Sequence, residues 1–202
     1  MSSSRERIRD DLITYYPLFY ACFKTLAKKC AGSPGRKQCK TVDQQTTYVV
    51  SARLLTECFC FLNKDRQNES LVDISGIKMD NIIFVERLEA LEHDRRNAVY
   101  AKSNLNSTFR TLMKIDKFGG LLTAVFHIHP GNGPGANLPS SIDLHDQNRR
   151  EQVGMKAIGG IFSRDGYIRF FSKSLKFSVR IIGKGVIQHG QYLYQLKDAQ
   201  DI

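Results

Sequence analysis

Two histidines and one aspartate lie close together in the sequence and could bind a metal ion. His127 and His129 are separated by a single residue, and Ser140 and Asp143 follow after a loop rich in glycine and proline. Two imidazoles and a carboxylate make three ligands, and catalytic zinc sites use three protein ligands while water takes the fourth position. The segment therefore predicts a hydrolytic zinc site with His127, His129 and Asp143 as ligands.

The elements expected around these residues can bring their side chains together. An apolar run at residues 121–126 precedes the histidines and predicts a buried strand, on which alternate side chains share one face. Ser140 opens a helical stretch whose first turn carries Asp143. Each feature also has a simpler explanation, because Ser140 and Asp143 fit a helix cap and a lone His-x-His is often structural. Their occurrence together, in this order, favours the metal site.

A hydrolytic site also needs a general base that takes a proton from water and passes it to the leaving amine. Glu57 is the first choice, since it precedes the apolar run at residues 58–62, which we expect to be a buried strand after a helix. Glu86 and Glu89, near the next expected strand, are the alternatives. A surface carboxylate at a helix end is the simpler role for Glu57.

The motifs resemble the signature of the JAMM (JAB/MPN) zinc metallopeptidases, in which a glutamate precedes His-x-His-Pro and Ser-x-x-Asp. Residues 127–130 and 140–143 supply the last two parts, with a longer loop between them than is usual in that family. A weaker likeness continues through residues 158–170. The resemblance implies that Glu57 is the base and that Ser140 helps to hold the tetrahedral oxyanion.

The same resemblance implies a fold and an activity. The fold would be an α/β or α+β sandwich, with a curved mixed sheet flanked by helices, of the cytidine-deaminase-like type. The activity would be zinc-dependent cleavage of a ubiquitin-like protein from its conjugates or precursor. A compact chain with an extra N-terminal helix is most similar to bacterial members that accompany small ubiquitin-like conjugation systems, often in antiphage defence. Two alternatives stay open, a DNA-associated protein similar to bacterial RadC and a non-catalytic MPN scaffold.

The distribution of charge indicates a basic N-terminal extension before the main domain. Residues 1–40 contain nine Lys or Arg against three Asp or Glu, so +6 of the net charge of +10 lies there. Apolar and aromatic residues recur at helical spacing from Ile8 to Leu26, which predicts an amphipathic helix that docks on the core, on a protein partner or on a second copy. We assign the metallopeptidase domain to residues 41–202. Solvated helix charge explains the basic excess without nucleic acid.

The remaining composition points to a cytoplasmic protein without membrane contact. The first residues are charged and contain no secretory signal, and no apolar run approaches the length of a membrane span. The five cysteines show no framework spacing. We expect free thiols, buried at Cys58 and Cys60.

Short patterns predict the other elements. Residues 43–56 favour a helix, although residues 48–50 alone favour a strand. Residues 63–70 should form a polar loop. We further expect a strand that begins at 81–85 and continues toward Leu91, and strands at 156–162, 167–171 and 177–182. A helix is expected at 104–117, with Phe109, Leu112 and Met113 directed inward.

Three further histidines are not expected to bind the metal. His145 lies two residues beyond Asp143 on the same helix, about 200° around its axis, and should face away from the metal. His93 lies in a charged segment, and His189 lies in a loop beside glycine. For both histidines this context predicts a surface or structural role.

Overall fold

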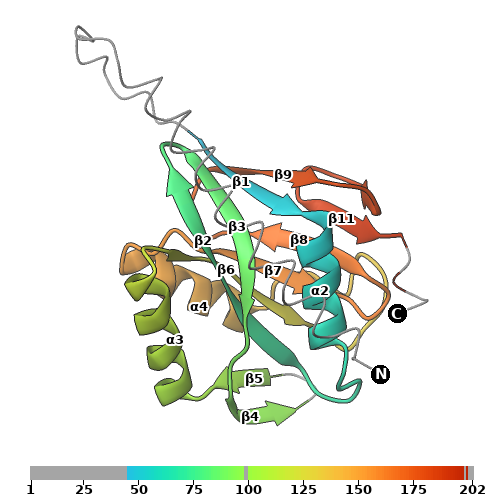
Figure 1. The fold of residues 1–202 in the computed structure, drawn as a ribbon. Helices are drawn as coiled ribbons and strands as arrows, with labels where there is room; N and C mark the ends of the chain where they lie inside the picture. The colour runs from blue at the N-terminus through green and yellow to red at the C-terminus, as the bar shows by residue number, and fades with distance from the viewer. Residues whose placement is uncertain (1–44, 98–99, 198, 200–202) are drawn as a thin grey trace, which may run out of the picture. The chain divides into compact units, whose positions relative to one another are not determined.

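The computed structural model describes residues 45–97, 100–197 and 199. Nine strands form one mixed sheet in the order β10-β11-β8-β7-β6-β2-β3-β1-β9, and β4 and β5 pair separately. The sheet is strongly curved, and the three helices of the described part of the chain pack on its two faces (Figure 1). The expected mixed fold with a curved sheet flanked by helices is therefore confirmed at this level. The elements are β1 Thr46–Ser51, α2 Ala52–Leu62, β2 Ser70–Met79, β3 Ile82–Glu89, β4 His93–Asn97, β5 Tyr100–Ser103, α3 Leu105–Lys117, β6 Leu121–Ile128, α4 Ser141–Gln152, β7 Ile158–Phe162, β8 Tyr167–Phe171, β9 Phe177–Ile182, β10 Val186–Gln188 and β11 Leu193–Leu196.

Helix α2 fills the inside of the curved sheet and corrects two predictions. Residues 46–51 form a strand where a helix was expected, and residues 58–62 continue the helix where a strand was expected. The Ser51 side chain caps α2 by accepting a hydrogen bond from the Leu54 N–H. A five-residue apolar run fits both periods, so only the spacing over the whole segment identifies a helix. Its buried residues are Ala52, Leu54, Leu55, Cys58, Phe59 and Leu62.

Strand β6 confirms the predicted histidine strand and carries His127 on the face opposite α2. Ala124, Phe126 and Ile128 are fully buried in the core that α2 completes. Because side chains alternate along a strand, Val125 and His127 point to the other face. Neighbouring strands support β6 on both sides, with β7 parallel and β2 antiparallel to it.

Strand β2 is a central strand that the sequence patterns did not predict. Polar residues interrupt its apolar alternation, and the register shifts between Ser75 and Gly76 where it pairs with β3. Ser70 lies opposite Ile128 in the antiparallel pairing with β6. Continuing this register by one residue places Glu69 opposite His129.

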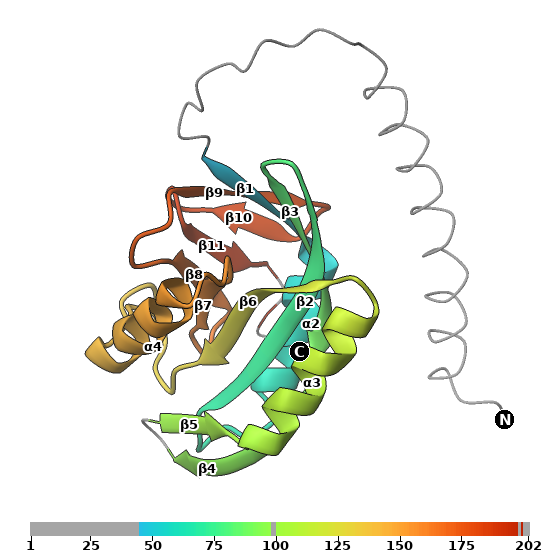
Figure 2. The ribbon, with the colours of Figure 1, turned by 90° about the vertical axis from the view of Figure 1, so that its left-hand side faces the viewer.

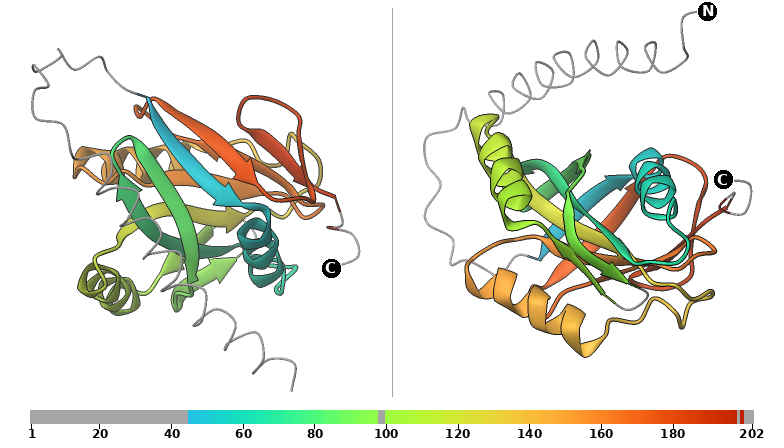
Figure 3. Two further views of the ribbon diagram at one scale, coloured as in Figure 1. Left: turned by 45° about the horizontal axis from the view of Figure 1, so that its top comes forward. Right: turned by 90° about the horizontal axis from the view of Figure 1, so that it is seen from below.

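Helices α3 and α4 lie on the other face of the sheet from α2 (Figures 2 and 3). Helix α3 confirms the helix predicted at 104–117 and is capped by the Asn104 side chain. Phe109 and Met113 are nevertheless 63% and 53% exposed, so their predicted inward orientation is wrong. Ile115 is the buried apolar residue of this helix. Helical spacing defines a stripe of residues, but it does not decide which stripe meets the sheet.

The C-terminal strands confirm the predicted hairpin at β7 and β8 and the predicted strand at β9. Curvature brings β11 near β9, which pairs with β1 on its other side. The Tyr192 hydroxyl donates to the Phe177 carbonyl at 2.9 Å, and the Tyr194 hydroxyl donates to the Val179 carbonyl at 3.2 Å. Two phenol groups thus cover part of the outer edge of β9.

The predicted N-terminal extension, residues 1–40, lies outside the described residues, and so does its boundary with the main domain. Within the described part of the chain, no helix has the length and apolar character needed to cross a membrane. Cys58 and Cys60 are free thiols; Cys58 is buried and Cys60 is half-buried.

Candidate metal centre

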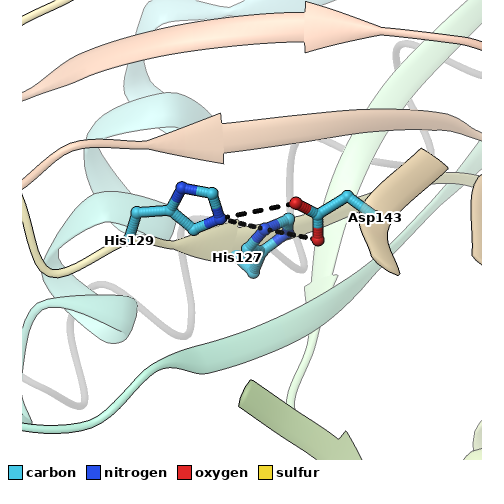
Figure 4. A group of neighbouring side chains, drawn as sticks. All are labelled: His127, His129 and Asp143. Carbon is cyan, nitrogen blue, oxygen red and sulfur yellow. Dashed lines mark hydrogen bonds and ion pairs between the residues drawn. The ribbon is translucent and has the colours of Figure 1, made fainter. Parts of the chain in front are cut away.

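The structure brings together the three residues expected to bind the metal. One donor atom from each of His127, His129 and Asp143 lies within 4.8 Å of the other two. The two histidine Nε2 atoms are 3.1 Å apart. The Asp143 carboxylate lies 3.2 Å from Nε2 of His127 and 3.5 Å from Nε2 of His129 (Figure 4). Donors bound to one tetrahedral zinc, each about 2.0–2.1 Å from it, lie roughly 3.3 Å apart. The spacing therefore fits a zinc ion.

The hydrogen bond on the far side of His129 fixes which of its nitrogens can bind. Nδ1 of His129 lies 2.9 Å from the Ala136 carbonyl. A carbonyl only accepts, so Nδ1 carries the proton and Nε2 presents a lone pair to the centre when the ring is neutral. Metal-binding histidines commonly donate their other N–H in this way. This lone pair of His129 faces the imidazole of His127 and the carboxylate of Asp143. A cation bound between the three groups would stabilise this arrangement.

Asp143 is held by the first turn of helix α4. The Ser140 hydroxyl donates to Oδ2 of Asp143 at 2.7 Å, and the Ser140 N–H donates to the same oxygen at 2.8 Å. The Asp143 N–H in turn donates to Oγ of Ser140, which completes a capping box. The cap and the proposed ligand are therefore the same pair of residues. Ser140 lies on the cavity wall beside the histidines.

The pKa shifts of His127 and Asp143 favour the forms that bind metal. Burial lowers the pKa of His127; the hydrogen bond and charge of Asp143 oppose this, the charges of His129 and Arg150 add to it, and the net pKa lies below the usual value, which favours the neutral ring. Burial lowers the pKa of His129, but hydrogen bonds with Asp143 and Ala136 and the Glu69 charge outweigh it, so the net pKa of this ring is raised. Burial raises the pKa of Asp143, but hydrogen bonds with both histidines and Ser140 outweigh it, and the net pKa is well below the usual range. Neutral imidazole and ionised carboxylate are the forms that bind metal.

Glu69 is a further acidic group at this centre, and the sequence patterns did not select it. Its Oε1 lies 4.0 Å from Nε2 of His129, and the residue as a whole is 8% exposed. Burial raises the pKa of Glu69 to about 7; the Asp143 charge contributes to the increase, while His129 and Arg164 oppose it. A glutamate that precedes an apolar strand after a polar loop was the available signal. It remained hidden because β2 itself was not predicted.

The three glutamates proposed as the base lie elsewhere, and none lines the cavity that contains the histidines. Glu57 is exposed in the middle of α2, on the other face of the sheet, so its expected position at the start of a buried strand is wrong. Glu86 is exposed on β3. Glu89 is buried, and its carboxylate binds Ser75, Arg87 and Lys114.

A cavity of about 420 Å³ opens beside the proposed ligands. Residues of β2, β5, β6, β8, α4 and the loop after β6 line it. Its walls combine a polar end with apolar surface, the composition typical of a ligand site. The lining residues are Glu69, Leu71, Ala101, Val125, His127, His129, Pro130, Gly131, Ala136, Ser140, Ile142, Asp143, Asp146, Arg150 and Phe171.

The β7–β8 turn fixes the loop that follows His129. Both carboxylate oxygens of Asp165 accept the Gly133 N–H at 2.9 Å, and the Ser163 hydroxyl donates to the same side chain. Arg164 reaches in the other direction, to the Asn68 carbonyl next to Glu69. One turn thus holds the segments on both sides of the centre.

The remaining histidines lie away from the three proposed metal ligands, as expected. His145 is exposed on α4. Nε2 of His93 accepts the Leu71 N–H at 3.2 Å, which is a structural role. His189 is exposed and contacts Gln195 and Tyr167. Among the described residues, His127, His129 and Asp143 are the cluster with metal-binding geometry.

Comparison with known proteins supports the fold alone. No protein-family model matches the chain, and no curated protein matches it. The solution structure of protein DSY2949 from Desulfitobacterium hafniense is similar, with a TM-score of 0.50 and 13% sequence identity; the match covers 68% of this chain and 94% of that chain. The two proteins therefore share a mixed α/β architecture.

Proposed function

We propose that the protein is a zinc-dependent isopeptidase or peptidase that cleaves a ubiquitin-like modifier from its conjugates or precursor. The supporting observation is the position of a buried carboxylate, Glu69, beside a group of two histidines and one aspartate in a cavity. Three ligands plus a separate acid–base group are the parts that metal-assisted amide hydrolysis needs.

His127, His129 and Asp143 would hold a zinc ion, which when bound would supply a Lewis acid to polarise the amide carbonyl and to lower the pKa of water. Glu69 takes the proton from the attacking water and returns it to the leaving nitrogen. Burial suits Glu69 to this task, because a base with a pKa near the working pH both accepts and releases a proton readily. This assigns to Glu69 the role that we first expected of Glu57.

Ser140 has a second role in this proposal. Its hydroxyl caps α4 and faces the cavity, so rotation about the C–O bond redirects the O–H toward the substrate carbonyl oxygen. A hydrogen bond there stabilises the oxyanion that forms when water adds to the carbonyl.

The first test is the zinc content of the purified full chain, measured by elemental analysis. We expect close to one zinc per chain in the parent and a strong loss in Asp143→Ala. Asp146→Ala is the matched control, because Asp146 lies three residues further along α4 on the same cavity wall but is not among the clustered ligands. No zinc in the parent, even after reconstitution, would reject the metal centre.

The second test is hydrolysis. A panel of ubiquitin-like proteins ending in Gly-Gly, each fused to a fluorescent reporter, supplies the substrates. Cleavage after the modifier that requires zinc supports the proposal. A zinc-loaded protein that cleaves no fusion favours the non-catalytic scaffold, and salt-sensitive binding to duplex DNA favours the RadC-like alternative.

A further inference from the structure

Arg150 brings a positive charge into the cavity that contains the proposed metal ligands. It lies in the last turn of α4, two turns beyond Asp143, and its side chain lines the cavity together with Asp146. Arginine remains protonated in proteins. The proposed metal ligands and a guanidinium group therefore line the same cavity.

The bonding of this guanidinium is incomplete. Its Nη2 atom donates a hydrogen bond to the neutral amide oxygen of Gln147, at 3.1 Å. Its Nε atom is buried and has no hydrogen-bond partner. No ion pair within 4.0 Å among the described residues includes Arg150. Arg150 is half-buried and feels the charges of the nearby carboxylates of Asp146, Asp73, Asp143 and Glu151. Because none of them forms an ion pair with it within 4.0 Å, its guanidinium has capacity for a ligand anion.

We propose that Arg150 forms a carboxylate-binding subsite next to the metal centre. A guanidinium presents two parallel N–H groups that match the two oxygens of a carboxylate. The surrounding charges favour a carboxylate over a phosphate, because Asp146, Asp143 and Glu69 line the same cavity and repel a doubly charged anion more strongly.

The apolar part of the cavity wall indicates the chemical character of the rest of the ligand. Val125, Ile142 and Phe171 line the cavity together with the polar groups. This surface suits a short, uncharged spacer between the carboxylate and the group at the metal. A dipeptide unit has this form, with an amide carbonyl followed by a carboxylate.

This inference rests on the proposed function for its choice of substrate. If zinc activates an amide at His127 and His129, then Arg150 selects substrates with a carboxylate close to the scissile bond. The carboxylate has two sources, the free C-terminus of a residue that follows the modifier or the side chain of an Asp or Glu. The first source corresponds to removal of a single C-terminal residue and the second to cleavage before an acidic residue inside a chain.

Arginine-selective NMR tests the subsite without any assay of hydrolysis. The full chain is labelled with ¹⁵N-arginine and titrated, with and without zinc, with three probes: acetyl-Gly-Gly, acetyl-Gly-Gly amide and acetyl-Gly-Asp amide. We expect the Arg150 Nε resonance to shift with at least one acid probe, which binds roughly tenfold or more tightly than the neutral amide because of the charged hydrogen bonds. The acid probe that binds more tightly identifies the source of the carboxylate.

Substitutions separate this subsite from direct binding of the carboxylate to zinc. Arg150→Gln should remove the preference for the acid probes and leave the zinc content unchanged. Arg149→Gln is the control, because Arg149 is the exposed neighbour and does not line this cavity. An Arg150 resonance that no probe moves overturns the inference, as does an acid preference that survives Arg150→Gln.

The titration of the zinc-free protein separates the proposed subsite at Arg150 from the proposed hydrolytic function. A preference for acid probes in the protein without zinc supports the subsite even if no hydrolysis is ever found. A zinc-loaded protein that hydrolyses modifier fusions but shows no Arg150 response rejects the subsite alone.

Discussion

Two glutamates show how strongly the place of a single residue decides its chemistry. We expect Glu69→Gln to keep its zinc, because Glu69 is not among the clustered ligands, and to lose cleavage of the modifier fusion by roughly a hundredfold or more. Glu57→Gln, on the exposed face of α2, should keep both zinc and activity. Zinc analysis and initial rates on the same preparations check this. Full activity in Glu69→Gln would remove this residue from the mechanism.

A second residue, Asp73 on β2, links stability to pH. Burial raises its pKa from the usual 3.8 to about 6; the Glu89 charge contributes to the increase and Arg150 opposes it. Because the folded-state pKa lies above the unfolded value, ionisation costs stability, and the protein becomes less stable as pH rises from about 4 through 6. Asp73→Asn should remove this loss and gain roughly 1–3 kcal/mol relative to the parent between pH 4 and pH 7.

Urea unfolding of the parent and of Asp73→Asn at both pH values measures this effect. The buried position of Asp73, 5% exposed, leaves little solvent screening. Two stability curves that run parallel from pH 4 to pH 7 would contradict the assigned ionisation.

Residue types predicted part of the centre well and part poorly. His127, His129 and Asp143 lie in two short motifs, so their local spacing was sufficient to identify them as a group. Glu69 lies 58 residues before His127 and joins the group only because β2 pairs with β6. Such pairing depends on the whole sheet, and spacing along the chain does not reveal it.

At the scale of elements, the β7–β8 turn should support the metal centre from a distance. Asp165 holds the Gly133 N–H in the loop whose Ala136 carbonyl orients His129. We expect Asp165→Asn to weaken zinc binding roughly tenfold to a hundredfold, measured by competition with a chromogenic chelator. Asp116→Asn, on the exposed side of α3, is the control. Equal zinc affinity in the two variants would show that the turn does not position His129.

Elements were predictable where one period dominated the pattern. The strands β6 and β9, the β7–β8 hairpin and helix α3 each matched their patterns. Helix α2 did not, since it ends in an apolar run of cysteines and aromatics at residues 58–62 that also suits a strand. Strand β2 was missed because the residues that face α3 and α4, such as Asp73 and Ser75, are polar even though they are buried.

At the scale of the whole molecule, the metal would join parts of the chain that are otherwise held by packing. His127 belongs to β6 and Asp143 to α4, so zinc would bind the folded state and not the unfolded chain. Such a ligand at a thousand times its Kd stabilises a protein by about 4 kcal/mol. We therefore expect a zinc chelator to lower the Tm of the parent by several degrees.

The matched measurement is the Tm of Asp143→Ala, which should not respond to the chelator. Differential scanning calorimetry of both proteins, with and without dipicolinic acid, checks the expectation. If the chelator does not change the Tm of the parent, or changes the Tm of the parent and of Asp143→Ala equally, zinc makes no structural contribution at this centre.

The phenol groups along β9 affect how copies of the protein meet at high concentration. An uncovered edge strand invites a strand of another chain to extend the sheet, and this is a common start of aggregation. Here the hydroxyls of Tyr192 and Tyr194 already bond to outward carbonyls of β9, and the opposite edge, β10, has only three residues. Neither end of the described sheet therefore offers a long free backbone to a strand of another chain.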